Sequence, residues 1–296
     1  MEKIYLSDYG PKVSPAIYGF WRWDDSSAAA ENEMEKIINL CLELGINTFD
    51  HADKYAGFLG EEIFGKVMEK KSFKREDIVL FTKCGLNVPH PNNPGVRIPH
   101  VDTSAAHITR SVENSLRKLQ TDYIDIFLLD QLDHLSDLEE TVITLERLKH
   151  SGKIRNLGVA NFSVFKQQLL ANHLRIPVVT NHIELNVLQT QAIDNGQLDY
   201  IRQKYSRPIA SAPLADGRIE NGTDAQAVKV RAKLEEIGKK YDSTVESTAV
   251  AWLNKLGALP LIGTRNEQRI RNIVNAFNIN MDHQDWYDLY YTSIGQ

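Results

Sequence analysis

The chain has 296 residues, of which 42% are hydrophobic and 25% are charged, and its formal net charge is -5 at pH 7. This length allows a sizeable core and suits either two average domains or one large α/β barrel. The mildly acidic balance gives no reason to expect nucleic acid or an anionic membrane as a partner.

Features that report on the cellular compartment are few. No stretch of about 18 apolar residues predicts a transmembrane helix, and the first residues show no basic, then apolar, secretory pattern. Cys41 and Cys84 are the two cysteines of the sequence. Two thiols in a chain of this size favour a reducing cytoplasm over a disulfide scaffold.

Short apolar runs alternate with amphipathic segments along the whole chain. The expected strands are Val13–Gly19, Ile46–Asp50, Ile78–Lys83, Ile124–Asp130, Ile154–Val159, Pro177–Asn181, Pro208–Ser211 and Leu259–Gly263. Runs of this length between turn residues are typical of strands buried on both faces. The expected helices are Ala29–Leu44, Gly60–Lys70, Ser104–Leu119, Leu138–His150, Ser163–Ala171, Gln191–Tyr205, Val228–Tyr241, Ser243–Leu256, Glu267–Ala276 and His283–Tyr291.

Eight such strands with helices between them predict a parallel sheet closed into a (β/α)8 TIM barrel. An open doubly wound sheet has the same local pattern, so closure is an expectation drawn from the number of strands. No linker or break in composition divides the chain, and we expect a single domain over residues 1–296. Two long connections, Cys84–Asp102 and Ala212–Asp224, follow expected strands at the end that carries the active site in such barrels.

Polar side chains end one expected strand after another. They are Asp50, Lys83, Asp130, Asn161, His182, Ser211 and Thr264. Residues such as Asp, Asn and Ser also simply begin turns. Lys83 resists that interpretation, because a lysine that ends an apolar strand has no role in a turn.

Tyr55 and Lys83 suggest acid–base chemistry. A phenol has a pKa near 10, and a neighbouring ammonium favours the phenolate and lowers that pKa. A carboxylate such as Asp50 keeps the lysine charged and in position. The three residues would then form a general acid for a carbonyl oxygen that receives a hydride.

Five segments in chain order resemble landmarks of the aldo-keto reductases. They are FDHADKY from Phe49, FTKCG from Phe81, SGKIRNLGVANFS from Ser151, TNHIELNVLQ from Thr180 and PLIGTR from Pro260. The resemblance spans roughly residues 13 to 275. It implies a (β/α)8 barrel, NADP(H) as the cofactor and a small-molecule carbonyl as the substrate.

The resemblance also implies residue roles. Asp50, Tyr55 and Lys83 match the aspartate, tyrosine and lysine of the catalytic tetrad. The implied cofactor contacts are Gly19, Phe20, Trp21, Asn161, His182, Ser211, Leu214, Gly263, Thr264, Arg265, Arg269 and Asn272. Arg269 would favour NADPH over NADH, since a guanidinium pairs well with a 2′-phosphate.

The chain departs from the family mainly at positions that the resemblance places near the nicotinamide and the reacting carbonyl. The fourth catalytic residue of the family is a histidine, where this sequence has Asp130. A serine and a glutamine are replaced by Ala160 and His182, and an aromatic residue is replaced by Ser211. Asn272 stands where many members have a glutamate.

Asp130 admits three interpretations. An ionised carboxylate would repel the developing alkoxide and weaken activity. A carboxyl kept protonated by burial and a like charge could donate to the substrate oxygen. The residue could also be a remnant in a protein without turnover. We expect His134, four residues downstream, to be an ordinary loop residue.

Other patterns are weaker. Gly60–Val67 resembles a P-loop but lacks the final Ser/Thr and has helical periodicity. Asp50 and His51 alternate on a strand and would not converge on a metal. The sequence contains no GxGxxG segment, which argues against a Rossmann dinucleotide site. We expect Phe20, Trp21 and Trp23 to form walls of the substrate pocket, because they follow the first strand.

Two functions of different classes remain open. The first is an NADPH-dependent oxidoreductase in which Tyr55 protonates an aldehyde or ketone oxygen. The second is an NADP(H)-binding sensor or regulatory protein with little or no turnover, which the cluster of substitutions around Asp130 favours. An unrelated metal-dependent barrel enzyme is disfavoured, because the sequence lacks convergent His and Asp ligands.

Overall fold

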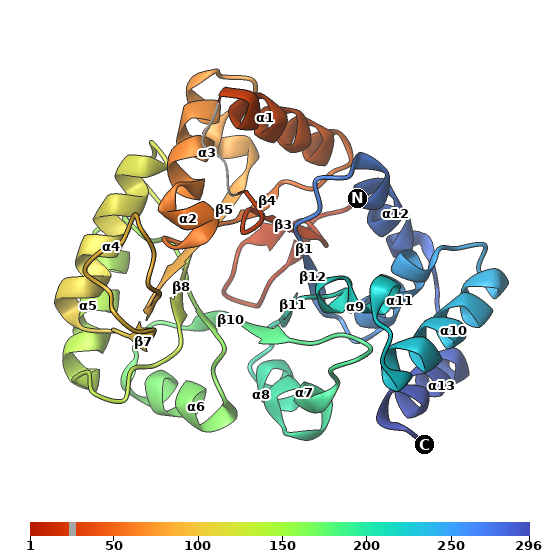
Figure 1. Ribbon diagram of the computed structural model, residues 1–296. Coiled ribbons are helices and arrows are strands. Elements are labelled where there is room, and N and C mark those ends of the chain that lie inside the picture. Colours follow the sequence, from red (N-terminus) through yellow and green to blue (C-terminus); the bar gives the residue numbers. More distant parts are fainter. Residues whose placement is uncertain (24–27) are drawn as a thin grey trace. The chain divides into compact units, whose positions relative to one another are not determined.

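A closed eight-stranded barrel is the central element of the computed structural model, which describes residues 1–23 and 28–296 (Figure 1). The order of strands around it is β3, β4, β5, β8, β9, β10, β11 and β12. Their bounds are Ile17–Gly19, Thr48–Asp50, Val79–Cys84, Ile126–Asp130, Leu157–Ala160, Val178–Glu184, Ile209–Ser211 and Leu259–Ile262. Each strand overlaps one of the eight expected runs, and the predicted (β/α)8 barrel is confirmed.

The chain divides into two compact units, Met1–Asn181 and His182–Gln296. The helices of the first unit are α1 (Ala28–Glu43), α2 (Tyr55–Phe58), α3 (Gly60–Glu69), α4 (Ala105–Lys118), α5 (Leu138–His150) and α6 (Val164–His173). Those of the second are α7 (Gln191–Asp194), α8 (Gln197–Gln203), α9 (Arg218–Asn221), α10 (Ala225–Lys240), α11 (Val245–Lys255), α12 (Glu267–Asn275) and α13 (His283–Ile294). The single domain over residues 1–296 stays a prediction.

Side-chain caps explain where most of the long helices begin. Ser104, Asp137 and Ser163 each accept a hydrogen bond from a backbone N–H in the first turn of α4, α5 and α6. Asp224, Thr244, Asn266 and Asp282 do the same for α10 to α13. Such residues satisfy N–H groups that have no partner within the helix. The cap at Asp224 also explains why α10 begins three residues before the expected start.

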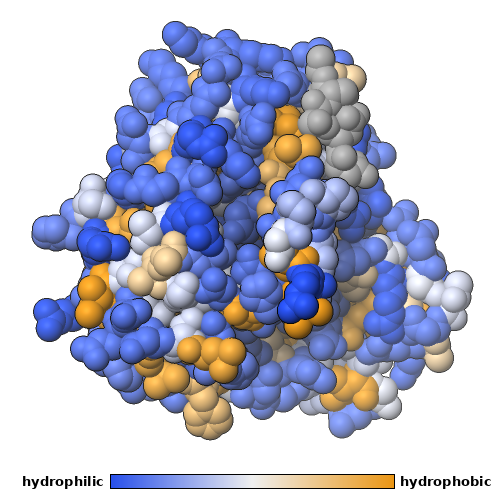
Figure 2. All heavy atoms as spheres, turned by 60° about the vertical axis from the view of Figure 1, so that its left-hand side comes forward, coloured by the Kyte–Doolittle hydropathy of each residue, from blue (hydrophilic) through white to orange (hydrophobic). Residues whose placement is uncertain are grey.

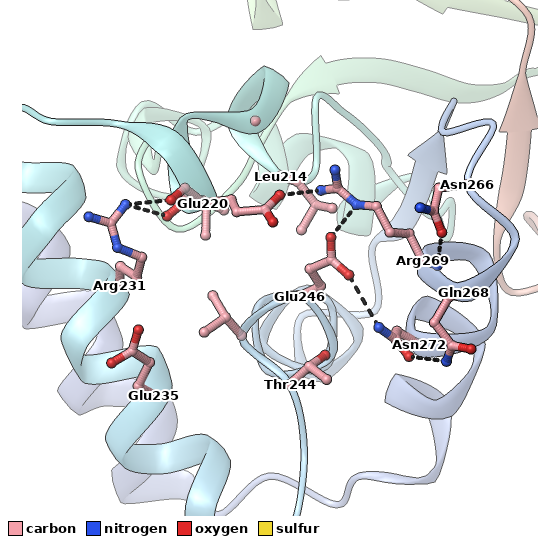
Figure 3. Close-up of a pocket in the computed structure, with 13 residues that line it drawn as sticks. Leu214, Glu220, Arg231, Glu235, Thr244, Glu246, Asn266, Gln268, Arg269 and Asn272 are labelled. Carbon is pink, nitrogen blue, oxygen red and sulfur yellow. Dashed lines mark hydrogen bonds and ion pairs between the residues drawn. The ribbon is translucent and has the colours of Figure 1, made fainter.

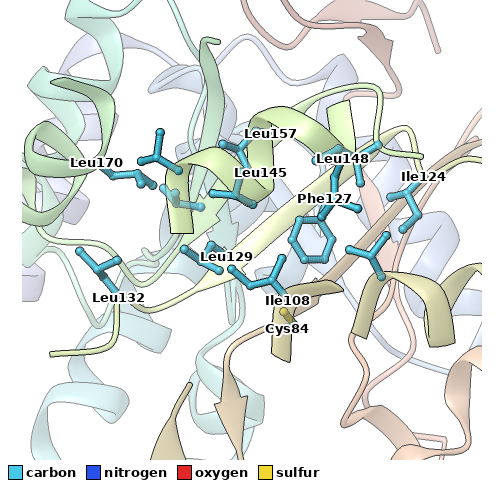
Figure 4. Packing of buried hydrophobic residues seen from close by; sticks show 14 of the residues in the cluster. Cys84, Ile108, Ile124, Phe127, Leu129, Leu132, Leu145, Leu148, Leu157 and Leu170 are labelled. Carbon is cyan, nitrogen blue, oxygen red and sulfur yellow. The ribbon is translucent and has the colours of Figure 1, made fainter. Parts of the chain in front are cut away.

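A hydrophobic cluster holds α4 and α5 against β8 and β9 in the first unit (Figure 4). Phe127 and Leu129 point outward from β8 and meet Ile108 of α4 and Leu145 of α5, all fully buried. Side chains at alternate positions on a strand share one face, which leaves the intervening residues for the barrel interior. Cys84 belongs to this cluster and, like Cys41, is a free thiol.

The first expected strand is shorter than predicted. Lys12–Val13 (β2) pairs with Ile4–Tyr5 (β1) in a separate antiparallel hairpin, and the barrel strand begins only at Ile17. Ser14 causes the break, because its Oγ accepts from the N–H groups of Asn47 and Thr48 and donates to the carbonyl of Ala16. Pro15, which has no N–H for a ladder, follows it directly.

Several segments expected to be irregular or continuous differ in the structure. The connection after β5 contains a small hairpin of β6 (Leu86–Asn87) and β7 (His100–Val101). The connection after β11 contains a 3-10 turn (Ala215–Gly217) and α9. The single helix expected at Gln191–Tyr205 is two helices, because Gly196 adopts a left-handed conformation with φ of 84° between them.

The surface is mostly hydrophilic. Figure 2 shows a face on which hydrophobic side chains form separate spots rather than one continuous patch. No helix within the described ranges, 1–23 and 28–296, is both long and apolar enough to cross a membrane.

Gly65 lets α3 and α4 approach closely. A Cβ at Gly65 would lie 2.0 Å from the carbonyl oxygen of Lys118, the last residue of α4. Gly60–Glu69 is a helix, so the P-loop interpretation of this segment is excluded and its second glycine serves packing.

We expect Gly65→Ala to lower the free energy of unfolding by about 1–3 kcal/mol, because the backbone of Lys118 must move away. Urea denaturation measures this change. Gly95→Ala is the matched control, since a Cβ there meets nothing within 4 Å. Equal stabilities of the two variants would contradict the close packing.

Candidate active site

A buried ion pair joins two neighbouring barrel strands in the first unit. Asp50 ends β4, and Lys83 lies near the end of β5. The Lys83 ammonium is 2.7 Å from Oδ1 and 2.6 Å from Oδ2 of Asp50, and it donates to the carbonyl of His51 at 2.9 Å. Burial lowers the pKa of Lys83 and raises that of Asp50, while each charge opposes the shift of the other. Three hydrogen bonds therefore fix the ammonium.

Tyr55 lies over this pair at the start of α2. The Lys83 ammonium is 4.5 Å from the centroid of the Tyr55 ring, and the Tyr55 hydroxyl donates to Oδ2 of Asp50 at 3.3 Å. Burial, followed by the carboxylates of Asp50 and Asp130, raises the pKa of Tyr55 above its usual value. The expectation of a lowered pKa is therefore wrong here, because burial and the two carboxylates outweigh the neighbouring ammonium. Tyr55 keeps its proton, as a proton donor must.

Asp130 is held by two donors. The Lys54 ammonium is 2.6 Å from Oδ2 of Asp130, and Nδ2 of Asn161 donates to Oδ1 at 2.7 Å. Gly85 packs closely against the backbone of Asp130, since its φ is 126° and a Cβ there would lie 2.6 Å from the Asp130 carbonyl oxygen. Both carboxylate oxygens accept hydrogen bonds, one of them from a cation. This geometry favours the ionised interpretation of Asp130 over the protonated one.

Asn161 occupies an unusual backbone position directly after β9. Its φ is 61°, a left-handed conformation that asparagine tolerates better than most residues. The turn exposes the side chain while Nδ2 reaches Asp130. Its Oδ1 accepts no hydrogen bond from the part of the chain that the structure describes, so this oxygen is available to a ligand.

The aromatic residues after the first strand do not all face a pocket. Phe20 and Trp23 are buried, and Phe20 stacks on His51 with ring centroids 4.5 Å apart. The prediction that both form pocket walls is wrong, because both rings are buried, that of Phe20 beside Phe64 and that of Trp23 beside Phe20. Trp21 is partly exposed with its ring 6.2 Å from that of Tyr55, so it stays a candidate wall.

His51 is a core residue. Burial, with a smaller effect of Lys83, lowers its pKa to about 3. Its ring stacks on Phe20 and packs edge-on against Phe64.

Among the residues of the described ranges, no three His, Cys, Asp or Glu side chains gather as a metal site would require. His134, by contrast, is exposed in a bend, as expected for a loop residue.

We expect His51 to make the fold sensitive to acid. Its pKa of about 3 in the folded chain lies below the usual value of about 6.5, so the unfolded chain binds one more proton between these pH values. Stability is therefore lost as the pH falls from about 6.5 towards 3, by about 1.4 kcal/mol per pH unit at most. Urea denaturation at pH 7 and pH 5 should show a smaller loss for His51→Leu than for the wild type. His134→Asn is the exposed control, and parallel losses in all three proteins would refute this account.

A pocket of about 660 Å³ lies in the second unit (Figure 3). Arg269, in the first turn of α12, is its main cation. The guanidinium is paired with Glu220 at 3.0 Å and also with Glu246. Glu246 accepts in addition from Asn272 at 3.5 Å. The arginine is therefore neutralised by two carboxylates, of which Glu220 is 53% exposed and Glu246 only 12%.

The other residues expected at the cofactor are distributed between the two units. Leu214 and Asn272 line the pocket beside Arg269. Gly263, Thr264 and Arg265 connect β12 to α12, and Thr264 Oγ1 accepts from the N–H of Asn266 at 3.2 Å.

Gly19, His182 and Ser211 lie in strands β3, β10 and β11 and are not among the residues that line this pocket. Their expected roles stay predictions.

Sequence analysis missed three charged residues at these sites. Lys54 precedes Tyr55 in a segment that we quoted, but nothing in the pattern pairs it with a strand 76 residues away. Glu220 and Glu246 come from two different helices and meet Arg269 only in the folded unit. No pattern in the sequence links these two carboxylates to Arg269.

A sequence profile described as "Aldo/keto reductase family" matches residues 15–290. This chain belongs to the aldo/keto reductase family. It is 37% identical to a 6-dehydroglucose reductase of Agrobacterium fabrum, over 100% of this chain and 99% of that protein. It is 35% identical to the uncharacterized oxidoreductase YcsN of Bacillus subtilis, over 98% of this chain and 97% of that protein.

The fold agrees with the family. The glycerol dehydrogenase AKR11B4 from Gluconobacter oxydans superposes with a TM-score of 0.87 at 21% identity, over 99% of this chain and 96% of that one. The chain is thus an oxidoreductase of the aldo/keto reductase type, and this class of enzyme acts on small carbonyl compounds with NAD(P)H.

Proposed function

We propose that the protein is an NADPH-dependent oxidoreductase that reduces an aldehyde or ketone, with Tyr55 as the proton donor. The cluster of Asp50, Lys83 and Tyr55 carries this proposal. It combines a protonated phenol with a buried ammonium at 4.5 Å from its ring. Such an arrangement supplies a proton and a fixed positive charge at one point.

Each residue of the cluster has one task. A bound reduced nicotinamide cofactor would supply the hydride. Tyr55 gives its hydroxyl proton to the carbonyl oxygen and passes through a phenolate. Burial disfavours that phenolate, and the charge of Lys83 stabilises it. Asp50 holds Lys83 by two hydrogen bonds and keeps it charged.

The residues of the second unit fit the adenosine phosphate end of NADP(H). The pocket offers the Arg269 guanidinium, the N-terminus of α12 and apolar side chains of Leu214 and Ile219. A phosphate is a suitable partner for a guanidinium and a helix N-terminus. A bound phosphate would displace Glu220, the more exposed of the two carboxylates, from Arg269.

In the first unit, Asn161 fits the carboxamide. Its Oδ1 oxygen is available to accept from an amide N–H, as its Nδ2 is used by Asp130. Gly19 and Trp21 are proposed beside the nicotinamide, and His182 and Ser211 in the second unit are proposed as further contacts.

We further propose a small-molecule carbonyl substrate and a cytoplasmic location, in keeping with the free thiols Cys41 and Cys84. The similar 6-dehydroglucose reductase of Agrobacterium fabrum makes oxidised sugars sensible members of a substrate panel. Simple aldehydes and ketones complete that panel.

Tyr55→Phe should lower kcat for carbonyl reduction by about 10²- to 10⁴-fold, because the phenol is the general acid. NADPH oxidation followed at steady state over the substrate panel measures this loss. Tyr205→Phe, an exposed tyrosine, should leave the rate unchanged.

Equal rates for wild type and Tyr55→Phe would reject the assigned mechanism. NADPH binding with no turnover on any carbonyl would instead support the alternative function, an NADP(H)-binding sensor or regulatory protein.

Arg269→Met should raise the Kd for NADPH about tenfold or more and change the Kd for NADH less than about twofold, because only NADPH carries the 2′-phosphate. Quenching of intrinsic fluorescence measures both values. Lys239→Met removes an exposed cation outside the pocket and should change neither. A similar loss for the two cofactors would place Arg269 elsewhere than at the 2′-phosphate.

A further inference from the structure

Lys54 is a cation at the catalytic cluster that the assigned mechanism does not use. It occupies the N-cap position of α2 directly before Tyr55, and its side chain is 17% exposed. Its ammonium lies 2.6 Å from Oδ2 of Asp130, whose side chain is only 5% exposed. The ion pair therefore combines a buried anion with a cation that solvent can still reach.

Asp130 is well placed to hold Lys54 rigidly. It is the last residue of β8, and its other oxygen is occupied by Asn161 at 2.7 Å. The carboxylate cannot rotate away without losing a second hydrogen bond. Lys54 is thus positioned by a group that is itself fixed from two sides.

The Lys54 ammonium has more N–H donors than its contact with Asp130 uses. An ammonium has three N–H groups, and one of them is directed at Asp130. No other acceptor for it lies within residues 1–23 and 28–296. A partly buried cation with unused donors is costly unless water or a ligand accepts from it.

The charge balance of the cluster also depends on Lys54. Asp50 and Asp130 both raise the pKa of Tyr55, and Lys54 and Asp130 both act on Lys83. These five groups therefore lie within electrostatic reach of one another. Asp53 also raises the pKa of Tyr55. Lys54 offsets the charge of Asp130, and without it the cluster would be more negative where an alkoxide must form.

We propose that Lys54 is a further catalytic residue, whose ammonium, positioned by Asp130, donates a hydrogen bond to the carbonyl oxygen of the substrate. This role rests on the carbonyl reduction proposed above. As the carbon gains hydride, the π pair of the C–O bond moves onto the oxygen, and that oxygen takes the proton of Tyr55. Lys54 keeps its own proton and stabilises the developing negative charge.

Lys54→Met tests the role directly. We expect kcat for benzaldehyde to fall about 100-fold, as is typical when one donor to a developing oxyanion is removed. The Kd for NADPH, measured by fluorescence, should stay within about twofold. Lys54→Arg should recover most of the lost rate, since it restores the cation and its donors.

Lys54→Gln guards against misfolding, because an amide can still donate to Asp130. It should fold as the wild type does by circular dichroism and yet lose about as much kcat as Lys54→Met. Lys240→Met is the matched control, since Lys240 is also paired with an aspartate, Asp285, at 2.7 Å on the surface. It should leave kcat unchanged.

A double-mutant cycle tests whether Asp130 positions Lys54. In an Asp130→Asn background, Lys54→Met should cost less than about tenfold, because the lysine has already lost its fixed position. Full additivity of the two losses would show that Asp130 does not position Lys54 and would overturn that part.

A matched pair of substrates, benzaldehyde and 4-carboxybenzaldehyde, locates the contact. Similar losses of kcat for both support contact with the carbonyl oxygen. A raised KM confined to 4-carboxybenzaldehyde would place Lys54 at a substrate carboxylate and overturn the proposal, as would wild-type kcat in Lys54→Met and Lys54→Gln. An absence of carbonyl reduction in the wild type would instead overturn the proposed function, and this inference with it.

Discussion

The buried ion pair of Asp50 and Lys83 is the constraint on which the arrangement around Tyr55 depends. Charges removed from water are expensive, and only close pairing with further hydrogen bonds offsets that cost. The neighbouring strands β4 and β5 supply this pairing, and the carbonyl of His51 supplies another acceptor. Because the pair is built on strands, the ammonium below Tyr55 has little freedom to move. The phenol is therefore presented against a fixed positive charge.

The second ion pair, between Lys54 and Asp130, changes how the departure from the family is understood. An aspartate alone at the end of β8 would add negative charge beside a forming alkoxide. Together with Lys54 it contributes no net charge and offers ammonium donors. Arg269 in the second unit is also paired within the protein, with Glu220 and Glu246, so that two carboxylates face one guanidinium. In both places the ion pairs are already formed within the protein.

Local patterns predicted the barrel well, because buried strands and amphipathic helices leave clear periodicities in the sequence. They failed where a single side chain intervened. Ser14 bonds to the backbone of the next strand and so delays β3, which no count of apolar residues reveals. Phe20 and Trp23 were assigned to a pocket because they follow a strand. Their rings lie in the core, where Phe20 packs against His51 and Phe64 and Trp23 packs against Phe20.

The sequence by itself determined the order of strands and helices, the family, and the presence of Asp50, Tyr55, Lys83 and Arg269 in their motifs. Only the tertiary structure decided which charges pair. Lys54 and Asp130 are 76 residues apart, and their contact depends on how a short helix and a strand end come together. Arg269 likewise meets Glu220 and Glu246 through the packing of three helices. Periodicity reports which face of an element is buried, whereas a pairing of side chains depends on distances set by the whole fold.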